Sequence, residues 1–246
     1  MTEKNTELVI VFCAHGSHSK AFMISFLSFF NKMKGKLNAK TKYCFIEINE
    51  PLIDYAIETS CKKYKLIIFI PALIFKGRHY VMDMKNKLDV FSKKFKKKII
   101  FTKNLSLNDE LISIFKSQIS EKVTNPKKTI LLTCASFSKE ENNVKMLRQY
   151  SKKLSIALKI ENFNYFLFGS ESKIISNLKK EIKIGNLNFI ILHPIFLFDG
   201  FLYNKLVYKF KQFFNKDLFV TKPLLDEKKV FDIFYERIQK KLILFK

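Results

Sequence analysis

The chain has 246 residues, of which 48% are hydrophobic and 15% aromatic, so it is too apolar for a disordered protein and long enough for two small domains. Its formal net charge is +23, but only three of its 45 basic residues are arginine. Because arginine supplies the bidentate contacts that read bases and phosphates, this composition argues against nucleic acid as the partner.

The sequence also argues against a membrane-spanning or secreted protein. The longest apolar run, residues 66–75, has only about half of the 18 or more residues that cross a bilayer, and it contains a proline. Residues 1–7 lack the basic start of a secretory signal, and the four cysteines show no CxxC motif. We therefore expect a cytoplasmic protein with reduced thiols and no membrane partner.

The first half of the chain alternates strand-like and helix-like segments. Strands are predicted at residues 7–13, 42–48, 65–70 and 98–102, and helices at 19–37, 51–63, 80–94 and 107–120. The strands are almost continuously apolar, as in parallel sheets that helices cover on both faces. This half is therefore predicted to be one α/β lobe of the (βα)₄ type, residues 1–121.

The same series returns after a polar linker at residues 121–128. Strands are predicted at residues 129–133, 164–168, 188–192 and 217–220, each followed by a helical pattern. Matched residues support a duplication: Cys13-Ala14 with Cys134-Ala135, Pro71 and Gly77 with Pro194 and Gly200, and residues 100–103 with 219–222. We expect two homologous lobes with parallel sheets, residues 1–121 and 128–246, that face each other across a cleft.

Reactive side chains lie at or just after the carboxyl ends of three strands of the first lobe. In open parallel sheets, ligands bind outside the carboxyl ends of the strands, where the strand order reverses. With the order 2-1-3-4, His15 and His79 would lie over the same cleft, with Glu47 at its rim. Two imidazoles and a carboxylate can hold Fe²⁺, Co²⁺ or Zn²⁺ and can accept protons near neutral pH, which suits metal insertion into a tetrapyrrole.

The second lobe lacks all three of these side chains. The alignment pairs them with unreactive residues: His15 with Ser136, Glu47 with Phe168, and His79 with Leu202. We therefore expect the first lobe to carry out the chemistry and the second to form the opposing wall.

Three segments, in this order, resemble the CbiX-type class II chelatases. They are Ala14-His15-Gly16-Ser17 after the first strand, residues 45–51 around Glu47, and the segment from Pro71 through Gly77-Arg78-His79 to Asp83. The resemblance covers essentially the whole chain, because long members of that family have two such lobes. It implies a chelatase-like bilobal fold, in which His15 and His79 bind the metal and accept protons and Glu47 assists.

The resemblance also implies the substrates. They would be a sirohydrochlorin-type tetrapyrrole and a divalent metal, Co²⁺ or Fe²⁺, with no cofactor beyond that metal and no ATP. Both siroheme and cobalamin biosynthesis remain open. A non-catalytic tetrapyrrole or metal carrier with the same ligands is the alternative function.

Five residues are expected to contact substrate: Ser17, Lys76, Gly77, Arg78 and His193. Structural alternatives stay open for three of them, namely a helix N-cap for Ser17, a salt bridge for Arg78 and a hydrogen-bonded core position for His193. The roles of His18, Glu50 and Asp83 are likewise open between function and structure.

A phosphoryl-transfer enzyme with His15 as the nucleophile is a third possibility. It is disfavoured because Ala14 precedes His15, where the phosphoglycerate-mutase pattern has arginine, and because no glycine-rich phosphate loop follows the first strand. Since the second lobe is joined covalently, we expect the monomer to be the competent unit.

Overall fold

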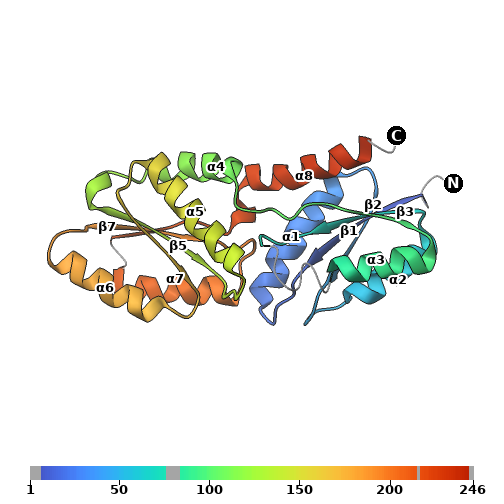
Figure 1. Cartoon of the computed structure of the whole chain (residues 1–246), viewed down its shortest axis with the longest axis horizontal. Helices are drawn as coiled ribbons and strands as arrows, with labels where there is room; N and C mark the ends of the chain where they lie inside the picture. Colours follow the sequence, from blue (N-terminus) through green and yellow to red (C-terminus); the bar gives the residue numbers. More distant parts are fainter. Residues whose placement is uncertain (1–6, 76–83, 215–216, 244–246) are drawn as a thin grey trace. The chain divides into compact units, whose positions relative to one another are not determined.

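The computed structural model describes residues 7–75, 84–214 and 217–243. Within these ranges the strands form two four-stranded parallel sheets, and helices connect successive strands (Figure 1). The predicted fold class, two α/β lobes with parallel sheets, is confirmed. The chain divides into two compact units: unit 1 holds the described residues up to Ser106 and those from Phe231 onward, and unit 2 holds Leu107–Val230.

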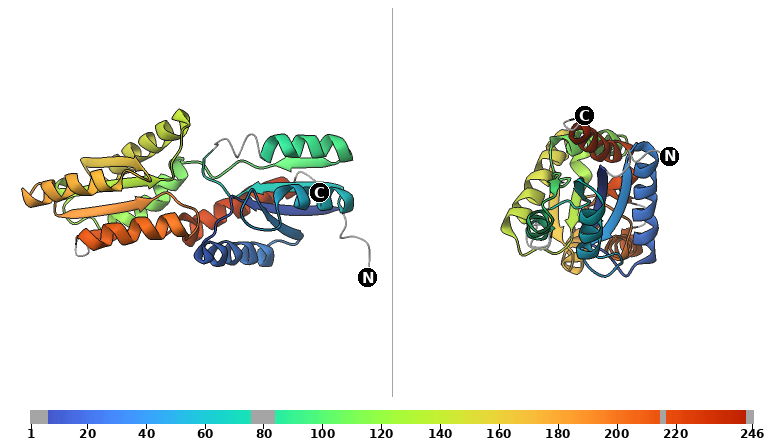
Figure 2. Two further views of the ribbon diagram at one scale, coloured as in Figure 1. Left: turned by 90° about the horizontal axis from the view of Figure 1, so that it is seen from below. Right: turned by 90° about the vertical axis from the view of Figure 1, so that its right-hand side faces the viewer.

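The sheet of unit 1 has the strand order β2-β1-β3-β4. Its strands are β1 (Leu8–Ala14), β2 (Lys40–Phe45), β3 (Leu66–Pro71) and β4 (Lys98–Phe101). Its helices are α1 (Lys20–Lys36), α2 (Ile53–Lys63), α3 (Asn86–Phe95) and most of α8 (Lys228–Ile243). Figure 2 shows α1 and α3 on opposite faces of this sheet.

The sheet of unit 2 has the equivalent order β6-β5-β7-β8. Its strands are β5 (Thr129–Ala135), β6 (Asn162–Leu167), β7 (Phe189–Pro194) and β8 (Leu218–Val220). Its helices are α4 (Asp109–Ser120), α5 (Glu141–Leu158), α6 (Glu171–Lys183) and α7 (Phe201–Phe214), with short 3₁₀ turns at Pro126–Lys128 and Leu224–Asp226.

The units differ from the predicted lobes, residues 1–121 and 128–246, in where the fourth helix of each repeat packs. Helix α4 belongs to unit 2, where the Phe115 ring lies 4.4 Å from the His193 ring. Most of α8 belongs to unit 1, where Phe231 and Phe234 pack edge-on against Phe29 of α1. Helix α4 thus packs against β7 of the second repeat and α8 against α1 of the first, so the chain crosses between units twice.

Backbone hydrogen bonds confirm the duplication. Ala72 N donates to Cys13 O in unit 1, and Ile195 N donates to Cys134 O in unit 2, each at 2.7 Å. These bonds equate Pro71 with Pro194, as the sequence predicted.

One predicted pairing is wrong by a single residue. Ile46 N donates to Ala14 O, and Phe168 N donates to Ala135 O. Phe168 therefore corresponds to Ile46, and the residue equivalent to Glu47 is Gly169. The sequence alone does not fix which residues pair across neighbouring strands. A shift of one residue therefore becomes visible only from the backbone hydrogen bonds between the strands.

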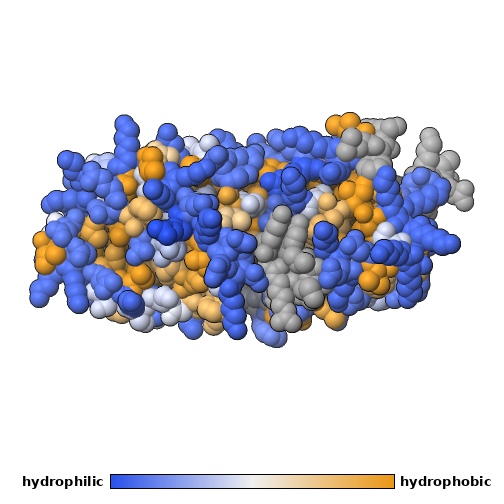
Figure 3. Space-filling view, viewed as in Figure 1, coloured by the Kyte–Doolittle hydropathy of each residue, from blue (hydrophilic) through white to orange (hydrophobic). Residues whose placement is uncertain are grey.

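The central strands explain the long apolar runs of the sequence. Val9–Cys13 of β1 and Ile67–Phe69 of β3 are fully buried, because helices cover both faces of the sheet. Hydrophilic residues cover most of the molecular face seen in Figure 3, with smaller hydrophobic areas between them. Among the described residues, no helix is long and apolar enough to span a membrane.

Candidate functional site

The candidate site lies where β1 and β2 of unit 1 end. His15 directly follows β1, and Glu47 lies two residues beyond β2. The parallel ladder continues past the strands, since Ile46 N donates to Ala14 O at 2.9 Å and Glu47 N donates to His15 O at 3.0 Å. The Nδ1 atom of His15 then lies 3.5 Å from Oε1 of Glu47. The structure therefore brings these two predicted site residues together.

Both side chains of this pair remain accessible to a ligand. The side chain of His15 is 41% exposed and that of Glu47 is 48% exposed. Water screens such a pair, so the contact adds at most about 1 kcal/mol to stability. Chemically, a carboxylate beside an imidazole can orient the ring, and the two side chains together can offer nitrogen and oxygen donors to a divalent cation.

Gly16 explains why a glycine follows the histidine. Its φ of +103° is a conformation that residues with a side chain rarely adopt. A Cβ atom added there would lie only 1.9 Å from the carbonyl oxygen of Glu47. Gly16 thus lets the β1–α1 loop approach the β2–α2 loop closely enough for His15 and Glu47 to pair.

Asn49 and Ser17 tie the two loops together. Ser17 N donates to Oδ1 of Asn49 at 2.7 Å, and Oγ of Ser17 accepts from Ser19 N at 3.1 Å. Helix α1 begins at Lys20 with Ser19 as its N-cap residue, so the N-cap alternative for Ser17 is wrong. The contribution of Asn49 was missed at the sequence level, because an asparagine that contacts a loop 32 residues away leaves no local pattern.

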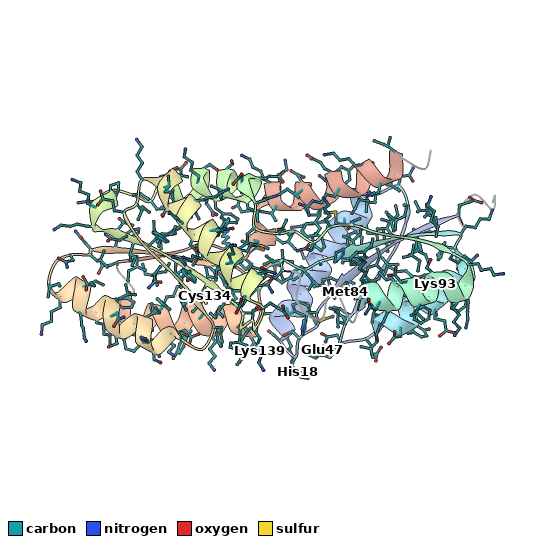
Figure 4. The ribbon with its side chains drawn as sticks, in the orientation of Figure 1. His18, Glu47, Met84, Lys93, Cys134 and Lys139 are labelled. Atoms are coloured by element: carbon teal, nitrogen blue, oxygen red, sulfur yellow. The ribbon has the colours of Figure 1, made fainter. Side chains whose placement is uncertain are left out.

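A shallow hollow of about 470 Å³ opens beside the loops. Its lining includes Ser17 and His18 from the β1–α1 loop, Met23 from α1, and Ile48 from the β2–α2 loop. Figure 4 shows His18 and Glu47 at the same end of unit 1. Ser17 therefore keeps its place at the candidate site, and His18 joins it there as an exposed residue.

Glu50 has a structural contact beside the site. Its Oε2 accepts a hydrogen bond from Leu52 N at 2.8 Å, and Leu52 is the N-cap residue of α2. This contact supports the structural alternative for Glu50, near the start of a helix.

The other half of the predicted site lies outside the described residues. This applies to Lys76, Gly77, Arg78, His79 and Asp83. Their segment follows β3, whose last residue Pro71 pairs with Cys13 of β1. Elsewhere in the described chain, no three His, Cys, Asp or Glu side chains form a group that could hold a metal ion. The role of His79 as the second metal ligand and base remains a prediction.

His193 is a core residue rather than a substrate contact. It is fully buried, with its Nε2 2.9 Å from the Tyr150 hydroxyl and its Nδ1 2.7 Å from the Thr221 hydroxyl. Burial lowers the pKa of His193 to about 3, so the ring is neutral. The sequence placed His193 just past the end of a strand, whereas β7 extends to Pro194 and holds it inside the sheet.

The first half of the chain, which contains the candidate site, matches known proteins in sequence. A family model described as CbiX matches residues 9–122, a range that includes His15, Glu47 and His79. A curated relative, the sirohydrochlorin cobaltochelatase of Sulfolobus acidocaldarius, is 30% identical over 105 residues, which are 42% of this chain and 83% of that protein.

Solved structures match the fold of nearly the whole chain. SirB from Bacillus subtilis with Fe³⁺ superposes with a TM-score of 0.75 at 16% identity, covering 95% of each chain. A CbiX described as the terminal enzyme for siroheme biosynthesis in denitrifying bacteria gives a TM-score of 0.64 at 12% identity, covering 95% of this chain and 98% of that one. These matches confirm the chelatase-like fold, and the sequence match to the Sulfolobus protein shows that this chain belongs to the CbiX family.

Proposed function

We propose that the protein is a class II chelatase that inserts Co²⁺ or Fe²⁺ into sirohydrochlorin without ATP, in siroheme or cobalamin biosynthesis. The observation that carries this proposal is the His15–Glu47 pair, which lies accessible at the carboxyl edge of a sheet in a chain of the CbiX family. The name of the Sulfolobus relative, a sirohydrochlorin cobaltochelatase, supports the choice of macrocycle.

Insertion requires a group that presents the metal and removes protons. The metal forms bonds to the pyrrole nitrogens, and both pyrrole N–H protons must leave the macrocycle. An imidazole suits both tasks, because it binds these metals and accepts protons near neutral pH. We assign them to His15, oriented by Glu47, and assign the second proton to His79.

The charge of the protein fits a polyanionic substrate. Sirohydrochlorin carries eight carboxylates, and the chain has a formal net charge of +23. A positive surface raises the local concentration of anions and speeds their capture, with a strong dependence on ionic strength. Sirohydrochlorin is therefore expected to bind more tightly than the dicarboxylate protoporphyrin.

A spectrophotometric insertion assay tests the proposal. Sirohydrochlorin and protoporphyrin are each offered to the full chain with Co²⁺, Fe²⁺ or Ni²⁺, and the change in the macrocycle absorbance is followed. We expect insertion into sirohydrochlorin with Co²⁺ or Fe²⁺ well above the protein-free rate. Binding of the macrocycle without accelerated insertion of any metal would instead support the carrier function.

A further inference from the structure

Ile48 adopts a strained backbone conformation next to Glu47. Its φ is +71°, and Asn49 N donates to Glu47 O at 2.8 Å, so residues 47–49 form a γ-turn with Ile48 at its centre. A γ-turn with positive φ is rare, and a β-branched residue in this region is an outlier. Glycine or asparagine would adopt the same turn with less strain.

The surrounding contacts hold Ile48 in this turn. On one side, Glu47 N donates to His15 O, and the backbone of Gly16 lies against Glu47 O. On the other side, Oδ1 of Asn49 accepts from Ser17 N. The same contacts that pair His15 with Glu47 therefore impose the strained conformation on Ile48.

Packing in the core does not explain an isoleucine at this position. Ile48 is 45% exposed and lines the hollow of about 470 Å³, together with Met23 and with Ile24, which is itself 71% exposed. Residues in strained conformations concentrate at functional sites, where the surrounding structure maintains them. An aliphatic residue that has a strained backbone and a half-exposed side chain beside a candidate site is suited to contact a ligand.

We infer that this hollow binds the apolar face of the planar macrocycle beside His15 and Glu47, and that Ile48 is a positioning residue for it. The inference rests on the proposed function for the identity of the ligand. The apolar wall of Met23, Ile24 and Ile48 matches the ring face, and His18 and Lys20 on the same lining match its peripheral carboxylates. A macrocycle held there places its pyrrole nitrogens near the metal- and proton-binding pair.

Substitutions that relax the turn test the inference. Ile48→Gly and Ile48→Asn both suit the positive φ but remove the apolar contact, whereas Ile48→Val keeps it. For the two relaxing variants, we expect the Kd of metal-free sirohydrochlorin, measured by absorbance titration of the full chain, to rise about five- to tenfold. Their melting temperature should stay the same or rise by a few degrees, because backbone strain is relieved. Ile48→Val should bind within about twofold of the unsubstituted protein.

Lys96→Gly is the matched control for strain relief, since Lys96 has a φ of +50° at the C-cap of α3 and does not line the hollow. It should leave the Kd unchanged. The inference is overturned if Ile48→Gly and Ile48→Asn keep the original Kd, or if both lower the melting temperature. Unchanged binding in these variants, together with metal insertion by the unsubstituted protein, refutes this inference alone. Weaker binding without any insertion supports the hollow and refutes the chelatase function.

Discussion

The carboxyl edges of the two sheets share a backbone hydrogen-bond pattern but differ in the side chains at equivalent positions. Unit 1 has His15, Gly16 and Glu47 where unit 2 has Ser136, Phe137 and Gly169, as the shared hydrogen bonds of β1–β2 and β5–β6 show. In unit 1 the two loops touch at Gly16, whereas a Cβ added at Gly169 would meet nothing within 4 Å. The duplicated backbone hydrogen-bond pattern therefore brings the two loops into close contact at Gly16 in unit 1, whereas the backbone at Gly169 in unit 2 has open space beside it.

The comparison also separates two kinds of histidine. His15 in unit 1 is partly exposed beside a carboxylate, and His193 in unit 2 is buried with both ring nitrogens hydrogen-bonded. The first is available to a ligand, and the second stabilises a sheet. The same residue type thus lies accessible at the end of one strand and packs in the core inside another.

The largest expected effect is on metal insertion, and it distinguishes the carboxyl edge of the sheet in unit 1 from that in unit 2. His15→Ala should lower kcat/KM for metal insertion at least about 100-fold, the usual effect of losing a general base. The matched change in unit 2, Ser136→Ala, should lower it less than about twofold. Insertion kinetics are measured for both, with circular dichroism to confirm the fold. Near-normal insertion by the His15 variant would place the chemistry elsewhere.

A second prediction concerns the pH dependence of stability. Burial lowers the pKa of His193 to about 3, against about 6.5 in an unfolded chain, so below pH 6.5 the unfolded state binds a proton that the native state excludes. This contribution to stability is present above pH 6.5 and is lost as the pH falls toward 3. At pH 5 the loss amounts to about 2 kcal/mol.

The measurement for His193 is the free energy of urea unfolding at pH 7 and pH 5, for the unsubstituted protein and His193→Gln. The side-chain amide of the introduced glutamine can still hydrogen-bond to Tyr150 or Thr221 but does not titrate. The unsubstituted protein should lose about 2 kcal/mol more than the variant between these pH values. An equal loss in both would mean that His193 is protonated in the native state.

Two glycines with positive φ provide a third prediction. Gly16→Ala and Gly169→Ala both place a side chain at φ above +100°, but only the first meets another atom, Glu47 O, at 1.9 Å. Gly16→Ala should therefore destabilise the protein by about 1–2 kcal/mol more than Gly169→Ala. Urea unfolding of the two variants checks this, and equal destabilisation would show that the loops of unit 1 separate freely.

The smallest expected effect is that of Glu47→Gln. This change keeps the size of the side chain but removes the charge beside His15, so kcat/KM for insertion should fall about fivefold, in keeping with an exposed ion pair. The matched change Glu50→Gln, outside the His15 pair, should leave kcat/KM unchanged. A loss comparable to that of His15→Ala would instead make Glu47 an equal partner in the chemistry.

Much of the architecture could be predicted from the sequence. Apolar runs such as residues 66–70 mark strands buried on both faces, and their alternation with amphipathic segments predicts a parallel sheet. The placement of His15 and Glu47 after adjacent strands was sufficient to predict that they lie at one edge. These features could be predicted because local periodicity can be read from a single sequence and because the geometry of parallel sheets is the same in all proteins.

Other features depended on contacts between distant segments. Helices α4 and α8 each have buried apolar residues, but only the folded chain shows that each packs into the unit formed by the other repeat. The burial of His193 and the strained turn at Ile48 likewise depend on partners far away in the sequence, Tyr150 for the first and the loop of Gly16 for the second. Periodicity in the sequence specifies which face of an element is apolar. Tertiary packing decides what that face meets, because that choice depends on the free energy of the whole fold.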